Sequence, residues 1–140
     1  MKGRRFLDTN VLIYTFDRSA PRKRKTATAL VAEALRTGSG MISYQVVQEF
    51  LNVALRKFHP PMTVVECRGY SQRVLFPLCE VYPSPDLYSE ALSIGQETGW
   101  TFYDSLIVAS ALAAKCDSVW SEDLQDGRVV RGLKIQNPFA

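Results

Sequence analysis

The chain has 140 residues, of which 46% are apolar and 22% are charged. This length allows a hydrophobic core, and this composition excludes an intrinsically disordered chain. The formal net charge of +3 is too small to predict a nucleic-acid partner by itself. The distribution of charge is more informative, because eight basic residues and only two acidic ones occupy the first 25 positions.

The three cysteines are widely spaced and odd in number, so the sequence predicts neither a disulfide framework nor a zinc site. Every apolar run is shorter than the roughly 20 residues of a membrane helix. We therefore expect a cytoplasmic protein without a membrane segment, folded as one domain over residues 1–140.

Short strands and helices alternate in the first half of the chain. A strand is expected at 5–8, followed by an apolar segment at 11–16 that begins a helix or packs tightly. Apolar residues at helical spacing predict a helix over 25–36, which Gly38 ends. A second strand is expected at 40–42, and Ser43 then caps a helix that runs to about residue 58.

The same alternation continues in the second half. Helices are expected at 63–76, at 86–98 and, after a break at Gly99, at 102–115 with Thr101 as its cap. Strands are expected at 78–82, 117–120 and 133–135. This order predicts a three-layer α/β/α fold with a short, mostly parallel central sheet. Ligands of such sheets bind at the carboxyl ends of the strands.

Four acidic residues are expected near those ends: Asp8, Glu49, Asp104 and Asp123. Each has a purely structural alternative. Asp8 and Asp123 are residue types that favour turns. Asp104 completes the capping-box pattern Thr101-x-x-Asp104. Glu49 belongs to a polar stripe on its helix with Gln45, Asn52 and Arg56. Together the four carboxylates would repel one another unless a cation lay among them. Oxygen ligands without histidine or cysteine favour Mg²⁺ or Mn²⁺.

Four segments carry a resemblance to a known family. They are 6–14 (FLDTNVLIY), 43–50 (SYQVVQEF), 103–111 (YDSLIVASA) and 121–125 (SEDLQ). In this order they resemble the motifs of the PIN-domain nucleases, and more closely those of the VapC-type toxins of bacterial toxin–antitoxin pairs. The resemblance spans nearly the whole chain.

The resemblance implies a metal-dependent endoribonuclease with Asp8, Glu49, Asp104 and Asp123 as catalytic and metal-binding residues. Glu122 and Asp126 compete with Asp123 for the fourth acidic position. Thr9, Asn10 and Ser121 are candidates to steady a carboxylate or a water molecule. The resemblance also implies a homodimer and a tight complex with a small antitoxin protein.

The basic run Arg22, Lys23, Arg24 and Lys25 is the candidate contact to RNA phosphates. A solvated surface patch is the alternative interpretation. Cations at the start of a helix oppose the helix dipole, and a polyanionic partner would offset that cost. The aromatic residues Trp100, Phe102 and Tyr103 could stack on bases, although core packing is the expected role for most of them.

Two other functions stay open from the sequence. One is a phosphatase or phosphotransferase with Asp8 as the covalent nucleophile, although such enzymes need a second aspartate where this chain has Asn10. The other is a non-catalytic RNA-binding module, which would not need four carboxylates. A dinucleotide-binding enzyme is disfavoured, because no G-x-G-x-x-G follows the first strand.

Overall fold

A computed structural model describes residues 3–140; Met1 and Lys2, which belong to the expected 1–140 domain, lie outside the described residues. Its centre is a six-stranded sheet with the order β3-β2-β1-β4-β6-β5. The strands are β1 (Arg5–Leu7), β2 (Gly40–Ser43), β3 (Cys79–Val81), β4 (Ser118–Trp120), β5 (Val129–Val130) and β6 (Leu133–Gln136). All neighbours pair in parallel except β5 and β6. The predicted mostly parallel sheet is confirmed.

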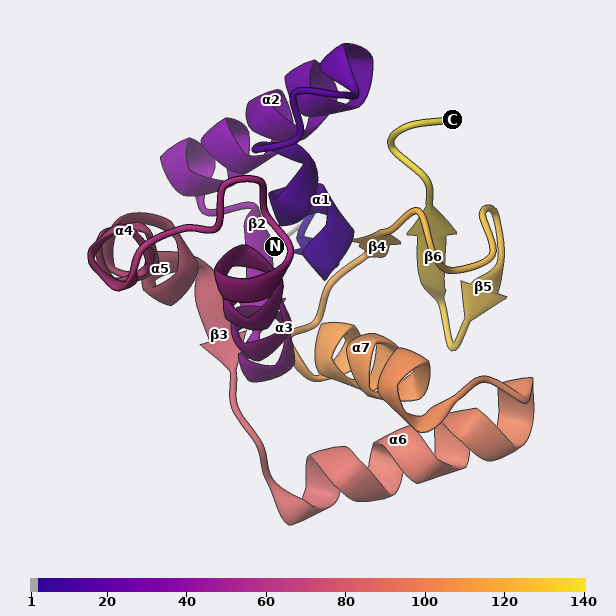
Figure 1. The fold of residues 1–140 in the computed structure, drawn as a ribbon. Coiled ribbons are helices and arrows are strands. Elements are labelled where there is room, and N and C mark those ends of the chain that lie inside the picture. The colour runs from indigo at the N-terminus through magenta and orange to yellow at the C-terminus, as the bar shows by residue number, and fades with distance from the viewer. Residues whose placement is uncertain (1–2) are drawn as a thin grey trace.

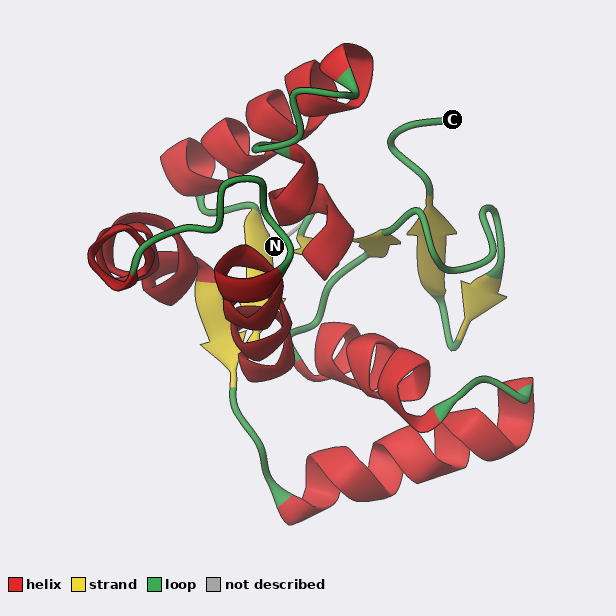
Figure 2. Ribbon diagram, in the orientation of Figure 1, coloured by secondary structure: helices red, strands yellow, loops and turns green. Residues whose placement is uncertain are grey.

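Helices occupy the connections between β1, β2, β3 and β4, whereas loops join β4, β5 and β6 (Figure 2). The helices are α1 (Thr9–Tyr14), α2 (Pro21–Thr37), α3 (Tyr44–Arg56), α4 (Val64–Tyr70), the π-helical turn η1 (Ser71–Leu75), α5 (Phe76–Leu78), α6 (Pro85–Thr98) and α7 (Phe102–Ala113). The chain steps from β1 to β2 to β3 in one direction and then returns to β4 on the other side of β1. Right-handed crossovers therefore place α6 and α7 on the opposite face from the earlier helices. In Figure 1 these two helices lie side by side, away from α1 and α2.

Three of the differences between the structure and the expected elements are the largest. Helix α2 begins at Pro21, four residues before the expected start, because a proline at the first helical position loses no hydrogen bond. The helix expected at 63–76 is divided by the π-helical turn η1. The two-residue strand β5 was not expected, since two residues carry no readable alternation.

The sheet and α2 approach each other closely at Gly40. A Cβ atom at this position would overlap the side chain of Ala34 on α2, so the close contact requires a glycine. Phe6, Met41 and Val119, from the three central strands, are fully buried in the same core. This packing gives the strand ends a fixed position from which functional side chains project.

Two expectations concern the chain as a whole. Within residues 3–140, no helix combines the length and the apolar character needed to cross a membrane. Cys67, Cys79 and Cys116 are free thiols.

Candidate active site

The carboxyl ends of β1 and β4 bring together two segments that are more than 100 residues apart. Leu7 on β1 pairs with Trp120 on β4, so the next residues, Asp8 and Ser121, meet beyond the sheet edge. The backbone N–H of Asp8 donates to the Trp120 carbonyl at 3.0 Å. Asp8 is also the N-cap of α1, so its position is fixed by both the strand and the helix.

Asp8 is the most deeply buried of the four acidic candidates, with 8% of its surface exposed. The Ser121 hydroxyl donates to one carboxylate oxygen at 2.6 Å, and the Thr9 N–H donates to the other at 2.7 Å. Burial raises the pKa of Asp8 to about 6 in spite of these two hydrogen bonds, and the charges of Glu49 and Asp123 add to the increase. Both donors are neutral groups, so they orient the Asp8 carboxylate without offsetting its negative charge.

Glu49 approaches the same place from α3, whose N-cap is Ser43 at the end of β2. The Thr9 hydroxyl donates to Glu49 Oε1 at 3.1 Å. Partial burial raises the pKa of Glu49, and the carboxylates of Asp104 and Asp123 raise it further. Glu49 and Asp123 thus act on Asp8, and Asp104 and Asp123 act on Glu49.

The carboxylate of Asp104 has no part in a full capping box. The Thr101 hydroxyl accepts the Asp104 N–H at 3.2 Å, but no hydrogen bond from the Thr101 N–H to the Asp104 carboxylate is formed in the described structure. By contrast, Thr63 and Glu66 at the start of α4 form both hydrogen bonds of the box. The side chain of Asp104 is thus available for another role.

Asp123 is tied to the site by Asn10. The Asn10 amide donates to Asp123 Oδ2 at 3.1 Å, and its carbonyl oxygen accepts the N–H of Glu122 at 3.3 Å. Ser121, which is completely buried, accepts the Asp123 N–H at 3.1 Å while it donates to Asp8. The loop after β4 is therefore fastened to α1 at two points.

The two competitors for the fourth acidic position have other partners. Glu122 accepts from the Tyr14 hydroxyl at 2.6 Å and forms an ion pair with Lys23 at 2.7 Å, and these contacts lower its pKa. Asp126 accepts the backbone N–H of Asn137 at 2.8 Å. Of the carboxylates of Glu122, Asp123 and Asp126, only that of Asp123 both contacts α1 and raises the pKa of Asp8 and Glu49.

The three residues expected to steady carboxylates each contact a different one. Ser121 donates to Asp8, Thr9 donates to Glu49 and Asn10 donates to Asp123. All three donors are neutral. They orient the carboxylates without cancelling their charge, as groups around a metal site do.

The four acidic candidates offer only oxygen ligands to a metal ion. Within residues 3–140, no three acidic, histidine or cysteine side chains are already arranged as a closed ligand set. The chemistry nevertheless fits a hard cation, because the candidates are all carboxylates and two of them are made more basic by burial and by their neighbours. Asp8, Glu49, Asp104 and Asp123 are the residues that could hold such an ion.

The four basic residues of the run 22–25 are not equivalent. Lys23 is paired with Glu122, and its ammonium group also lies 4.9 Å from the centre of the Tyr14 ring. Arg22, Arg24 and Lys25 are exposed on the first turns of α2. Sequence reasoning missed the role of Lys23 in holding the loop after β4, because its partner is 99 residues away.

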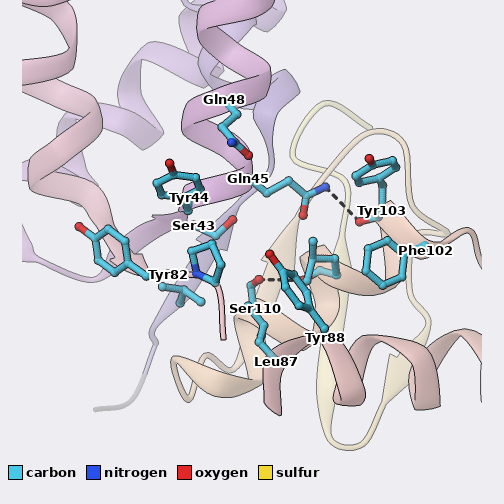
Figure 3. A pocket seen from close by; sticks show the side chains of 13 residues that line it. Ser43, Tyr44, Gln45, Gln48, Tyr82, Leu87, Tyr88, Phe102, Tyr103 and Ser110 are labelled. Atoms are coloured by element: carbon cyan, nitrogen blue, oxygen red, sulfur yellow. Dashed lines mark hydrogen bonds between the residues drawn. The ribbon is translucent and has the colours of Figure 1, made fainter. Parts of the chain in front are cut away.

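A groove beside the acidic residues was also missed. It has a volume of about 380 Å³ and lies between the start of α3, the segment after β3, and helices α6 and α7 (Figure 3). Phe102 and Tyr103 line it and are exposed by 39% and 67%, so the expectation of core packing is wrong for both. Trp100 lies elsewhere, beneath the guanidinium group of Arg128.

Comparison with known proteins places the chain in a family. The PIN domain matches residues 5–129, and the chain therefore belongs to the PIN-domain family. None of the curated proteins matches the sequence.

Several solved structures share the fold at low sequence identity. DNA-bound VapBC from Salmonella typhimurium is 20% identical, with a TM-score of 0.66 over 96% of this chain and 98% of the other. A toxin–antitoxin complex from Klebsiella pneumoniae is 18% identical, with a TM-score of 0.63 over 96% and 97%. VapC20 from Mycobacterium tuberculosis, a toxin that cleaves the sarcin–ricin loop, is 19% identical, with a TM-score of 0.61 over 85% and 91%.

Proposed function

We propose that this protein is a metal-dependent endoribonuclease and the toxin of a toxin–antitoxin pair. The observation that supports the proposal is the fixing of Asp8, Glu49 and Asp123 by neighbouring donors beyond the strand ends of a PIN fold. Asp104 joins them in the proposal because its charge raises the pKa of Glu49. Three of these carboxylates are oriented by neutral hydrogen-bond donors that leave their negative charge in place. A cation is the partner that such a cluster lacks.

The reaction class is hydrolysis of an RNA phosphodiester bond. Asp8, Glu49, Asp104 and Asp123 would hold Mg²⁺ or Mn²⁺, and the bound ion would acidify a water molecule and offset charge on the phosphate. The chain's own residues orient the ligands: Ser121 fixes Asp8, Thr9 fixes Glu49, and Asn10 fixes Asp123. The Lys23–Glu122 ion pair holds the loop that carries Ser121 and Asp123 against α2.

The two alternatives have less support. A phosphatase with Asp8 as the nucleophile would need a second aspartate two residues on, but Asn10 stands there and its amide donates to Asp123. A non-catalytic RNA-binding module would gain nothing from repelling carboxylates at a surface that meets a polyanion.

The proposal includes partners. Structures similar in fold are named as VapBC, FitAB and other toxin–antitoxin complexes. We extend this assembly to the present chain, with a small antitoxin covering the acidic site, a homodimer as the toxin, and residues 1–140 acting as one domain. Size-exclusion chromatography with light scattering, on the chain alone and after co-expression with the protein encoded beside it, tests both contacts.

The decisive experiment is induced expression of the wild type and of Asp8→Asn in a bacterium, followed by sequencing of new RNA ends. We expect growth arrest and discrete RNA ends with the wild type only. Asp86→Asn, an exposed aspartate in the first turn of α6, is the matched control and should behave as the wild type. Arrest by Asp8→Asn equal to that of the wild type would contradict the proposal.

A further inference from the structure

The groove beside the acidic cluster differs from it in chemistry. None of the described residues that line the groove is charged. Two aromatic groups form its walls: Tyr44 with Tyr82, whose ring centres are 6.2 Å apart, and Tyr88 with Phe102, at 6.3 Å. Figure 3 shows the two groups on opposite sides of the opening. A neutral, aromatic-walled groove fits a flat, uncharged group better than a phosphate.

Gln45 supplies an unused hydrogen-bond acceptor in this groove. Only 8% of its surface is exposed. Its amide nitrogen donates to the Tyr103 carbonyl at 3.2 Å, and because a carbonyl can only accept, this contact fixes the orientation of the amide. Gln45 Oε1 is buried and has no hydrogen-bond partner within residues 3–140. A buried acceptor without a donor destabilises the fold, so its presence points to a ligand that donates to it.

The acceptor lies close to the proposed reaction centre. Gln45 and Glu49 are four residues apart on α3 and therefore lie on the same face, about one helical pitch of 5.4 Å apart. On the other wall, Tyr103 is the residue before Asp104. The groove is thus the next space that a strand of RNA reaches when one of its phosphates lies among the carboxylates.

We propose that this groove binds one nucleobase of the RNA, next to the phosphate that is cleaved, and that it contributes to the choice of cleavage position. An N–H group of the base donates to Gln45 Oε1, while the rings of Tyr88 and Phe102 pack on the base. Aromatic rings bind the faces of all bases, and the amide acceptor reads the edge of one. The inference deepens the proposed ribonuclease function and rests on it.

The test uses short single-stranded oligoribonucleotides that contain one preferred cleavage position. The base on each side of that position is varied in turn, and one oligonucleotide is abasic there. We expect the wild type to cut the abasic RNA about tenfold or more slowly than the RNA with the best base, because an abasic site cannot stack on the aromatic rings. Gln45→Met keeps the length of the side chain and removes the acceptor, and it should flatten the preference among the four bases.

Stability separates this effect from unfolding. Gln45→Met removes the acceptor without a partner and also the donor to the Tyr103 carbonyl, so the two effects on stability oppose each other. Its melting temperature should therefore stay close to that of the wild type. Tyr88→Ala should slow cleavage of every base-containing RNA and leave the abasic RNA unaffected. Phe76→Ala changes an aromatic residue that is 57% exposed and lies outside the groove, and it should leave base preference unchanged.

The outcomes distinguish the two proposals. If the wild type cuts RNA and Gln45→Met retains the same base preference, the groove proposal is overturned while the proposal of a ribonuclease stands.

If the wild type cuts no RNA with Mg²⁺ or Mn²⁺, the proposed ribonuclease function is overturned. The groove is then tested by the fluorescence of an oligoribonucleotide with a single 2-aminopurine. Quenching by the wild type that is lost in Gln45→Met and Tyr88→Ala would support the groove, and equal signals would overturn it. A change of oligomeric state in Tyr88→Ala, with base preference unchanged, would assign the groove to a second copy of the chain instead.

Discussion

The acidic cluster and the neutral groove lie side by side at one edge of the sheet, but they differ in the interaction that the protein itself does not supply. In the cluster, Asp8 already accepts two hydrogen bonds and still has a raised pKa, so what it lacks is positive charge. In the groove, Gln45 Oε1 has no donor and no charged neighbour lines the walls, so what it lacks is a hydrogen bond. In the two proposals, the cluster would carry out chemistry on the phosphate and the groove would select the base.

The largest expected effect would come from removing one carboxylate of the cluster. Asp8→Asn should reduce RNA cleavage by at least about 10²–10³-fold, because electrostatic stabilisation of the reacting phosphate depends on the ion that Asp8 helps to hold. Mn²⁺ affinity, measured by calorimetry, should fall with it. Asp123→Asn should show a similar loss.

Asp126→Asn is the matched control for the fourth acidic position, since Asp126 lies in the same loop but accepts the Asn137 N–H. It should keep wild-type cleavage and Mn²⁺ affinity. If Asp126→Asn loses activity and Asp123→Asn does not, the fourth carboxylate has been assigned to the wrong residue.

The next largest effect concerns stability without metal. The pKa of Asp8 is about 6 in the folded protein and 3.8 as its ordinary value. The free energy of unfolding is therefore reduced least by Asp8 below pH 4, where Asp8 is protonated in both the folded and the unfolded state. It falls as the pH rises from about 4 through 6, where Asp8 is charged in the unfolded state but still largely protonated in the folded one. This difference in the pKa of Asp8 corresponds to a loss of at most about 3 kcal/mol in the free energy of unfolding.

Asp8→Asn should remove this loss. In EDTA, the variant should melt at a higher temperature than the wild type at pH 8, and the two should converge at pH 4. Asp86→Asn should follow the wild type at both values. Equal melting curves for Asp8→Asn and the wild type at pH 8 would show that the burial of Asp8 imposes no electrostatic cost.

A smaller effect is expected when a carboxylate is left in place and its orienting donor is removed. Ser121→Ala deletes the hydroxyl that donates to Asp8 at 2.6 Å and accepts the Asp123 N–H. Mn²⁺ affinity should fall about 10- to 100-fold, the range found for residues that support metal ligands. Ser110→Ala also removes a buried hydroxyl, but one that donates to the Leu106 carbonyl within α7, and it should leave Mn²⁺ affinity unchanged.

The sequence was informative where the signal is local or topological. The end of α2 at Gly38, the capping of α3 by Ser43 and the parallel sheet follow from short patterns. Because parallel strands end at one edge, the meeting of Asp8 with the loop after β4 could also be predicted. The assignment of catalytic roles to these residues stays a prediction.

The details that were missed depend on distant parts of the chain. Gln45 belongs to a polar stripe on α3 that looked like a solvated face, but helix α7 covers it, and periodicity within one helix cannot show that. The pairing of Lys23 with Glu122 joins residues 99 positions apart, and no local pattern distinguishes Lys23 from its basic neighbours. The pattern Thr101-x-x-Asp104 reads the same whether or not the Asp104 carboxylate closes a capping box. The sequence therefore could not show that this carboxylate is left out of the box.

The smallest expected effect separates the members of the basic run. Arg22, Arg24 and Lys25 are exposed, and each should contact an RNA phosphate as an independent cation. Replacing any one with Gln in an Asp8→Asn background should reduce the log–log salt slope of single-strand binding by roughly 0.7. Lys23 already forms an ion pair with Glu122, so Lys23→Gln should leave the slope unchanged. It should instead loosen the loop after β4 and weaken Mn²⁺ binding, which the other three variants should not do.

Arg36→Gln, at the opposite end of α2, controls for the loss of one charge from the same helix. The base preference of the groove should survive all of these changes, because phosphate contacts carry no base information. If all four variants in the run reduce the slope equally, the Lys23–Glu122 pair does not persist when RNA binds; if none does, the RNA backbone takes a path away from α2.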